Sequence, residues 1–262
     1  MYTLGLDFGS TASKGVIIED GKKIVATAVI SSGTGTSGPQ RVQEELDKVS
    51  GLKFEDMSAV VVTGYGRMKY ERADKQVSEL SCHAKGVHFL VPEARTVIDI
   101  GGQDAKALKL DENGFLVNFV MNDKCAAGTG RFLDVMSGVL ETEVSKLGEL
   151  SSKATAPVGI SSTCTVFAES EVISHLSNDA GVENIVAGIH ESVAGRVSGL
   201  AKRVGVQDKV VMVGGVARNS GVVKAMEEAL RVQITVPEYP QLTGAIGAAL
   251  FAYEEAKKKA SA

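Results

Sequence analysis

One pattern of strands and turns occurs twice in the sequence, and it limits the possible folds more than any other feature. An apolar strand ends at an aspartate closely followed by glycine, a second strand runs back, and a tight hairpin turn leads into a third. The aspartates are Asp7 and Asp99, and the hairpin turns are at 20–21 and 111–114. This duplication predicts two lobes of related architecture, each beginning with a β-meander.

The remaining segments alternate between helical and strand patterns, which is typical of an α/β fold. The segment 182–204 has apolar residues at helical spacing over its whole length and predicts one long helix. Further helices are expected at 40–49, 79–90, 130–140, 222–230 and from 245 onward, and further strands at 57–63, 209–213 and 233–236.

The expected domain boundaries follow from the repeat. We expect a first lobe at 1–95, to which a C-terminal helix at 245–262 returns, and a second lobe at 96–244. The glycine- and serine-rich segment 31–39 is either a flexible surface connection or a loop near the ligand, and its composition leaves both interpretations open.

Composition excludes several classes of protein. The chain has 262 residues, of which 44% are hydrophobic, so it has enough apolar material for two compact lobes. Its net charge of -4 gives no basic footprint for a nucleic-acid partner. It contains no apolar run of about 18 residues for a membrane span, and its first residues do not resemble a signal peptide. Three cysteines are too few for a disulfide framework and favour a cytoplasmic protein.

The two Asp–Gly turns have the chemistry of a phosphate site. Glycine lets the backbone bend toward a ligand, and neighbouring hydroxyl and amide groups can hold phosphate oxygens. The aspartate can orient Mg²⁺ through its water ligands. The sequence contains neither a Walker A motif nor a G-x-G-x-x-G motif. Each turn alone is more often structural, but two such turns facing each other would clasp a polyphosphate.

Four motifs in order resemble the actin, Hsp70 and sugar-kinase superfamily: DFGST at 7, DIGGQD at 99, VGGVARN at 213 and TGAIGAAL at 243. The resemblance implies duplicated ribonuclease-H-like lobes with a nucleotide cleft between them, in which Asp7 and Asp99 face Mg²⁺ and the phosphates. Gln103 and Asp104 are the candidates for positioning the attacking water. The expected nucleotide-binding residues are Ser10, Thr11, Ala12, Ser13, Lys14, Gly15, Gly101, Gly102, Thr129, Gly130, Gly214, Gly215, Asn219 and Gln241.

Two of the three cysteines occur in similar local sequences. Cys125 and Cys164 each come shortly before a helix, whose unpaired N–H groups stabilise a thiolate or an anionic cluster. Cys82 lies inside a helical pattern and is expected to be a buried thiol. One chain cannot supply a four-cysteine site, but two cysteines from each subunit of a dimer can. On the residues alone, two structural thiols remain the alternative to a shared metal cluster.

Five stretches closely resemble one family within that superfamily: VTGYGR at 62, IDIGGQDAK at 98, MNDKCAAGTGRFL at 121, SSTCTVFAESEV at 161 and GGVARN at 214. The family is the BadF/BadG/BcrA/BcrD-type ATPases. It comprises the activators of 2-hydroxyacyl-CoA dehydratases, such as (R)-2-hydroxyglutaryl-CoA dehydratase, and the ATPase subunits of benzoyl-CoA reductase. The resemblance covers essentially the whole chain.

The family resemblance implies a homodimer that holds one oxygen-sensitive [4Fe-4S] cluster on Cys125 and Cys164 of each subunit. Driven by ATP, the dimer would pass one electron from ferredoxin or flavodoxin to the dehydratase. A small-molecule kinase of the same superfamily, without iron, is the main alternative. A non-catalytic, nucleotide-switched module is the second. A measurement of iron content distinguishes the cluster-bearing activator from both alternatives.

Overall fold

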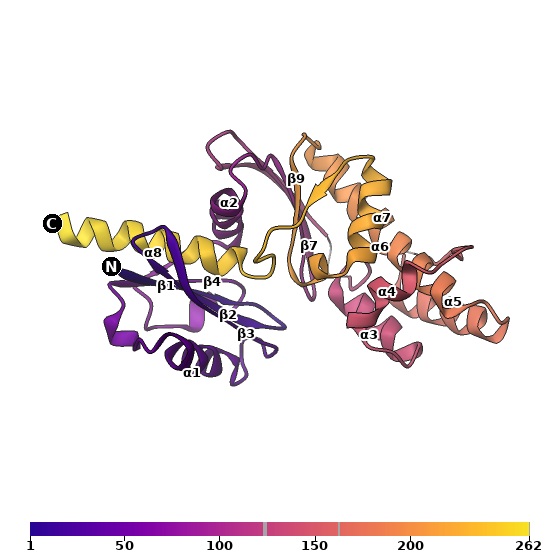
Figure 1. Ribbon diagram of the computed structural model, residues 1–262, viewed down its shortest axis with the longest axis horizontal. Helices are drawn as coiled ribbons and strands as arrows, with labels where there is room; N and C mark the ends of the chain where they lie inside the picture. The colour runs from indigo at the N-terminus through magenta and orange to yellow at the C-terminus, as the bar shows by residue number, and fades with distance from the viewer. Residues whose placement is uncertain (123–124, 162, 262) are drawn as a thin grey trace. The chain divides into compact units, whose positions relative to one another are not determined.

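The computed structural model describes residues 1–122, 125–161 and 163–261, and the chain forms two compact units (Figure 1). Unit 1 comprises Met1–Glu93, Asp111–Leu116 and Gln241–Ala262, and unit 2 comprises Ala94–Leu110 and Val117–Pro240. Each contains a five-stranded mixed sheet covered by helices. The predicted α/β fold with two related lobes is therefore confirmed.

The sheet of unit 1 has the strand order β3-β2-β1-β4-β5. The first three strands form an antiparallel meander, and β4 and β5 continue the sheet parallel to β1. The elements are β1 (Tyr2–Phe8), β2 (Ser13–Glu19), β3 (Lys23–Ile30), α1 (Gly38–Ser50), η1 (Phe54–Asp56), β4 (Ala59–Thr63), η2 (Arg67–Lys69), β5 (Lys75–Gln76), α2 (Glu79–Leu90) and α8 (Thr243–Ser261).

Side-chain alternation along β1 places different residues on the two faces of this sheet. Leu4, Leu6 and Phe8 pack into the core beneath α1, whereas α2 and α8 cover the opposite face (Figure 1). On that face Gly5 allows α8 to approach the sheet closely, because a Cβ there would lie only 2.0 Å from the carbonyl oxygen of Ala245 in α8. The odd-numbered face of β1, which includes Asp7, is thus the face toward α8.

The sheet of unit 2 has the equivalent order β10-β9-β6-β7-β8. Its core is formed largely by the long helix α6 together with α3, α4, α5 and α7. The elements are β6 (Thr96–Ile100), β7 (Ala105–Leu110), β8 (Leu116–Met121), α3 (Gly130–Val139), η3 (Val144–Lys146), α4 (Leu147–Ser151), α5 (Thr165–Ser177), α6 (Val182–Val204), β9 (Val210–Val213), η4 (Gly215–Arg218), α7 (Ser220–Leu230) and β10 (Ile234–Thr235).

The repeat extends to the register of the strands. In unit 1 β1 pairs antiparallel with β2 and parallel with β4, and in unit 2 β6 pairs antiparallel with β7 and parallel with β9. Both Asp–Gly turns therefore lie at the same end of equivalent strands. In the part of the chain that the structure describes, every helix is too short or too polar to cross a lipid bilayer.

Candidate functional site

Asp7 is a buried carboxylate of unit 1. It is the next-to-last residue of β1, and its side chain is 5% exposed. Lys14 lies directly across from it on β2, and its Nζ is 3.0 Å from Asp7 Oδ2. Consecutive side chains of a strand point to opposite faces of the sheet. Of the stretch Ser13–Gly15, only Lys14 therefore lies on the same face as Asp7. Gly15 instead lies against Leu46 of α1.

Two glycines bring backbone close to the Asp7 carboxylate. Gly64, directly after β4, has a left-handed φ of +85°, and a Cβ there would lie 2.4 Å from Asp7 Oδ1. Gly244, in the first turn of α8, would place a Cβ 3.0 Å from Asp7 Oδ2. Neighbouring Thr243 shares a 2.9 Å hydrogen bond between its Oγ1 and Nδ1 of the buried His83. The aspartate is therefore held from three sides.

The predicted phosphate turn of unit 1 is divided between exposed and structural residues. Ser10 and Thr11 are exposed, so their hydroxyl and amide groups can reach a ligand. Ala12 accepts a hydrogen bond from the amide of Gly9 and so closes the turn. Ser13 is buried, and its Oγ donates to the carbonyl oxygen of Ser32. The segment 31–39 consequently packs against this turn, and the amide of Thr34 also donates to Gly9.

Unit 2 repeats the arrangement around Asp99. Lys106 lies directly across from Asp99 on β7, with 3.5 Å between Nζ and Oδ2. Gly214, directly after β9, has a φ of +86°, and a Cβ there would lie 2.6 Å from Asp99 Oδ1. Lys106 was not among the residues predicted from the sequence. The signal was present, since Lys14 follows Asp7 and Lys106 follows Asp99 at the same spacing.

The turn after Asp99 is closed by Asp104, whose carbonyl oxygen accepts a 2.8 Å hydrogen bond from the amide of Gly101. The Asp104 carboxylate also contacts Lys106 at 2.7 Å and remains 40% exposed. Gln103 is exposed beside it. Asp104 is thus a partly exposed carboxylate beside the turn, whereas Asp99 is buried.

The same turn supports the start of α3. The first amides of a helix lack partners within the helix, and here the amides of Gly130 and Arg131 donate to the carbonyl oxygens of Gly101 and Gly102 at 2.9 and 2.8 Å. Preceding them, Thr129 is fully buried and donates from its Oγ1 to the carbonyl oxygen of Ala126 at 2.6 Å. Continuous hydrogen bonding thus joins the Asp99 turn to the residues after Cys125.

The remaining predicted nucleotide-binding residues have two kinds of environment. Gly215 is exposed at the start of η4, and Gln241 is half-buried just before α8. Asn219 instead caps α7, because its Oδ1 accepts from the amides of Gly221 and Val222. Its Nδ2 lies 3.1 Å from Nε2 of His190 on α6. Burial lowers the pKa of His190 from 6.5 to about 4, so the ring is neutral and Nε2 accepts this hydrogen bond.

The cysteines are divided between the two units. Cys125 and Cys164 are half-buried in unit 2, while Cys82 is fully buried in α2 of unit 1. Burial, chiefly, raises the pKa of the Cys82 thiol from 9.0 to about 12, which makes it a poor ligand. Cys164 is the N-cap residue of α5, but its side chain makes no capping hydrogen bond. Asp123, Lys124 and Ser162, within the predicted cysteine motifs, lie outside the described residues.

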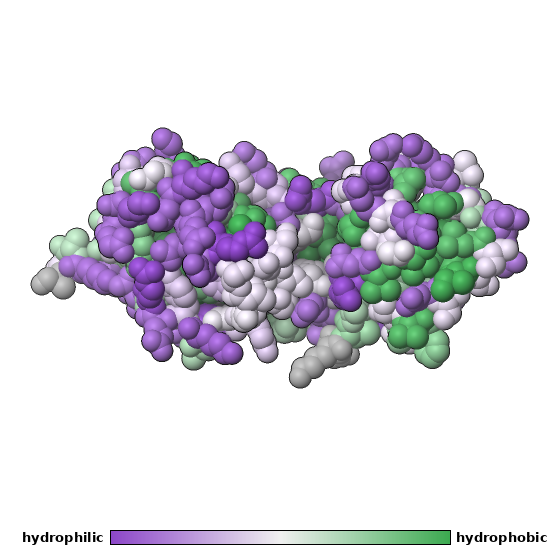
Figure 2. Space-filling model, turned by 90° about the horizontal axis from the view of Figure 1, so that it is seen from below, coloured by the Kyte–Doolittle hydropathy of each residue, from purple (hydrophilic) through white to green (hydrophobic). Residues whose placement is uncertain are grey.

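Apolar side chains are exposed next to both cysteine segments. Val166, Phe167 and Ile173 of α5 and the alternating residues Val117, Phe119 and Met121 of β8 are all exposed. Figure 2 shows hydrophobic side chains gathered on one face of unit 2. α3 and α5, the helices that follow the two cysteines, pack against each other. Each cysteine therefore lies within a few residues of exposed apolar surface.

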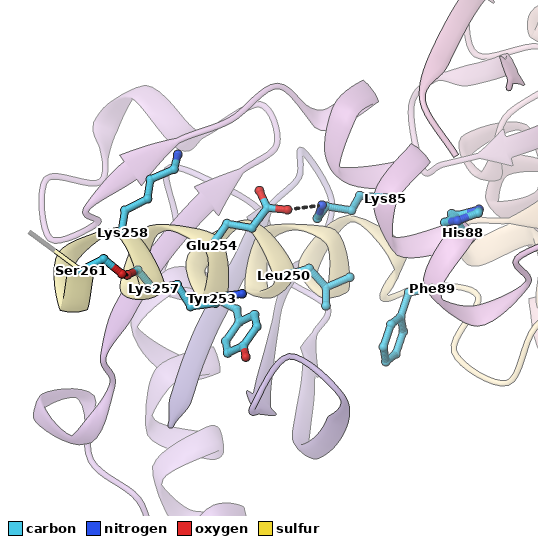
Figure 3. A pocket seen from close by; sticks show the side chains of 9 residues that line it. All are labelled: Lys85, His88, Phe89, Leu250, Tyr253, Glu254, Lys257, Lys258 and Ser261. Atoms are coloured by element: carbon cyan, nitrogen blue, oxygen red, sulfur yellow. Dashed lines mark hydrogen bonds and ion pairs between the residues drawn. The ribbon is translucent and has the colours of Figure 1, made fainter. Parts of the chain in front are cut away.

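A hollow of about 680 Å³ in unit 1 contains none of the predicted site residues (Figure 3). It lies beside α2 and α8 and is mostly apolar, with Phe89 and Leu250 among its lining. At its edge, Lys85 pairs with Glu254 at 2.7 Å, as the dashed line in Figure 3 marks. Polar and charged side chains also line it, but it contains none of the residues predicted from the sequence, so we do not assign it to the candidate site.

The fold is shared with sugar kinases of low sequence identity. A glucokinase of the ROK family from Streptomyces griseus superposes with a TM-score of 0.60 over 97% of this chain and 100% of its own, at 13% identity. The two-lobe fold defined by these sheets and turns is thus one used by nucleotide-dependent enzymes. The chain belongs to the BadF/BadG/BcrA/BcrD ATPase family, which it matches over residues 4–252.

Relatives within the family are considerably more similar. The chain is 68% identical to the 2-hydroxyisocaproyl-CoA dehydratase activator of Clostridioides difficile, over 98% of this chain and 97% of that protein. A structure of that activator with bound ADPNP has a TM-score of 0.98 at 67% identity, covering 100% and 97% of the two chains. The (R)-2-hydroxyglutaryl-CoA dehydratase activating ATPase of Acidaminococcus fermentans is 59% identical, over 98% and 99%.

Proposed function

We propose that this protein is an ATP-dependent, one-electron activator of a 2-hydroxyacyl-CoA dehydratase. Membership of the ATPase family and the high identity to dehydratase activators support this function. The observation that carries it is the hydrogen bonding from Gly130 and Arg131 to Gly101 and Gly102. That contact joins the turn expected to meet ATP to the segment that holds a candidate cluster ligand.

The nucleotide is ATP with Mg²⁺, and Asp7 and Asp99 are the candidate carboxylates for orienting the metal. The structure of the relative from C. difficile contains bound ADPNP, and in this chain a buried aspartate before each of the two phosphate-type turns is paired with a lysine. Asp7 and Asp99 would hold Mg²⁺ through its waters, because Mg²⁺ keeps much of its hydration shell. Ser10 and Thr11 offer exposed groups to the phosphates, and Asp104 with Gln103 orients the attacking water.

The donor set of unit 2 fits an iron–sulfur cluster shared between two chains. Cys125 and Cys164 are the half-buried thiols, and thiolates are the usual ligands of [4Fe-4S] clusters. Among the described residues, no three His, Cys, Asp or Glu side chains are grouped to hold a metal ion. Because the chain has three cysteines, a four-thiolate centre requires ligands from a second chain, and we propose a homodimer. When bound, such a cluster accepts and donates one electron at a time, taken here from ferredoxin or flavodoxin.

The position of the α3 N-terminus supports coupling between the nucleotide turn and the Cys125 segment. A change in the Asp99 turn moves the carbonyl oxygens of Gly101 and Gly102, and these are bonded to the first amides of α3. The displacement then reaches the Cys125 segment through Thr129 and its two hydrogen bonds to Ala126. ATP binding and hydrolysis at one end thereby alter the surroundings of the cysteine at the other.

Two dehydratases are the candidate partners. The sequence motifs lead us to propose (R)-2-hydroxyglutaryl-CoA dehydratase. The identity of 68% to the 2-hydroxyisocaproyl-CoA dehydratase activator, against 59% to the hydroxyglutaryl-CoA protein, favours the isocaproyl enzyme as a second candidate. Activation assays with each purified dehydratase, reduced ferredoxin or flavodoxin, and ATP distinguish them.

The decisive experiment measures iron, sulfide and mass under anaerobic conditions. We expect a dimer with about four irons, retained in Cys82→Ala and lost in Cys125→Ala and Cys164→Ala, with ATP binding intact in all three. Asp7→Ala should show the reverse, with iron retained and hydrolysis lost. A colourless protein that phosphorylates a small-molecule acceptor would instead support the kinase alternative. Iron retained in Cys164→Ala would contradict the assignment of the ligands.

A further inference from the structure

Lys14 and Lys106 occupy equivalent register positions but different environments. Each lies across an antiparallel strand pair from its aspartate. The Lys14 side chain is 20% exposed, whereas that of Lys106 is 4% exposed. Lysine is rarely buried to this extent without opposite charges around it. Of the two equivalent lysines, Lys14 is therefore partly exposed and Lys106 is enclosed.

Two carboxylates surround Lys106. Its Nζ donates to Asp99 Oδ2 at 3.5 Å and lies 2.7 Å from Asp104 Oδ2. The shorter contact is with the more exposed of the two carboxylates, since Asp104 is 40% exposed and Asp99 is 4% exposed. The Lys106 ammonium group is held between these two carboxylates and has little access to solvent. Its position is suited to fixing the Asp104 side chain.

The backbone restricts Asp104 from the other side. A Cβ at Gly101 would lie 2.5 Å from Asp104 Oδ1, so this oxygen lies directly over the glycine. The Gly101 amide donates to the Asp104 carbonyl oxygen, which closes the turn beneath the carboxylate. One carboxylate oxygen is thus placed against Gly101 and the other against Lys106.

We propose that Lys106 is the positioning residue for ATP hydrolysis and acts through Asp104, an inference that rests on the proposed ATPase function. Asp104 orients the water whose oxygen bonds to the γ-phosphorus while the bond to the bridging oxygen breaks. The bond electrons leave with ADP, and the proton lost by the water passes to the Asp104 carboxylate and then to solvent. Lys14, the more exposed counterpart, contributes to phosphate binding instead.

The internal repeat supplies a matched pair of variants for the test. Lys106→Met should lower kcat for ATP hydrolysis about 100-fold, because a small misplacement of a reacting group has an effect of this size. The Kd for ADPNP should change by less than about threefold, since only a step after binding is affected. Lys14→Met should instead raise this Kd about tenfold, through the loss of a charge-assisted contact. Lys106→Arg should recover part of kcat.

A double-mutant cycle separates positioning from general structural support. In an Asp104→Asn background, Lys106→Met should lower kcat by less than about threefold further, because residues acting as one unit are not additive. Additive losses, or a Kd raised as far as in Lys14→Met, would overturn the inference. If Lys106→Met does not fold, the variant Asp104→Glu tests the proposed role of Asp104 instead. It leaves Lys106 in place but moves the carboxylate, so an unchanged kcat would overturn the role of Asp104.

The wild-type protein separates this inference from the function on which it rests. Absence of ATP hydrolysis in the wild type, assayed with its dehydratase and a reduced donor, overturns both. Normal hydrolysis in the wild type together with an unchanged kcat in Lys106→Met overturns only the positioning role.

Discussion

The amide of Gly130 donates a hydrogen bond to the carbonyl oxygen of Gly101 at 2.9 Å, across 29 positions of the chain (130 minus 101). Gly130 is the first residue of α3, and Gly101 begins the turn that follows Asp99. A Cβ on Gly130 would lie 3.2 Å from that carbonyl oxygen and 3.3 Å from Gly102 Cα. The contact therefore depends on glycine at the helix start.

Gly130→Ala tests whether this contact couples the two proposed activities. The added methyl group has to move the helix start or the turn by a few tenths of an ångström. We expect iron content and ATP binding to remain, while dehydratase activation per ATP hydrolysed falls about tenfold, a change of about 1.4 kcal/mol in coupling. Gly138→Ala, on the same helix and with no atom near its added Cβ, is the matched control. Equal coupling in both variants would mean that the contact does not transmit the change.

Asn219→Ala should mainly destabilise unit 2. The variant removes the cap that accepts from two amides of α7, a loss of about 0.5–2 kcal/mol. It also leaves Nε2 of His190 without its donor in a buried position. Asn219→Ser, which retains a capping oxygen, should recover part of the loss in chemical denaturation. A large fall in ADPNP affinity without a change in stability would instead show that Asn219 contacts the nucleotide.

Most of the fold could be predicted from periodicity and turn chemistry. The helix expected at 182–204 is α6 with those bounds, and the strands before and after each Asp–Gly turn occur where expected. These elements have strong local signals, because their apolar spacing and glycine turns are contained within short segments. The periodicity of α5 is a weaker signal, because this helix carries apolar residues on both its buried and its exposed sides.

The site was only partly predictable, because several of its contacts join distant segments. Asp7, Lys14 and Asp99 follow from motifs, and the structure brings each aspartate together with a lysine. The role of Gly64 depends on β4 lying parallel to β1, which no local pattern encodes. Asn219 occurs in a nucleotide-type motif, yet its position before a helix was an equally good signal for an N-cap. The ligand roles of the individual residues remain predictions.

The buried Cys82 thiol should make the stability of the protein sensitive to alkaline pH. Its pKa is raised by burial from 9.0 to about 12, so between these values the unfolded chain loses a proton that the folded chain keeps. The contribution of the protonated Cys82 thiol to the free energy of unfolding is fully present below pH 9. Above pH 9 it is lost at about 1.4 kcal/mol per pH unit. Unfolding free energies of wild type and Cys82→Ala should therefore converge as pH rises above 9. A constant difference between them would contradict this assignment.

His190 should produce the opposite dependence at acidic pH. Burial lowers its pKa from 6.5 to about 4, so between these values the unfolded chain binds a proton that the folded chain excludes. The contribution of the neutral His190 ring to the free energy of unfolding is fully present above pH 6.5. It falls by up to about 1.4 kcal/mol per pH unit as the pH decreases toward 4. His190→Gln, which does not titrate, should flatten this part of the pH profile of unfolding. If His190→Gln retains the wild-type slope between pH 6.5 and 4, proton exclusion by His190 is not the cause.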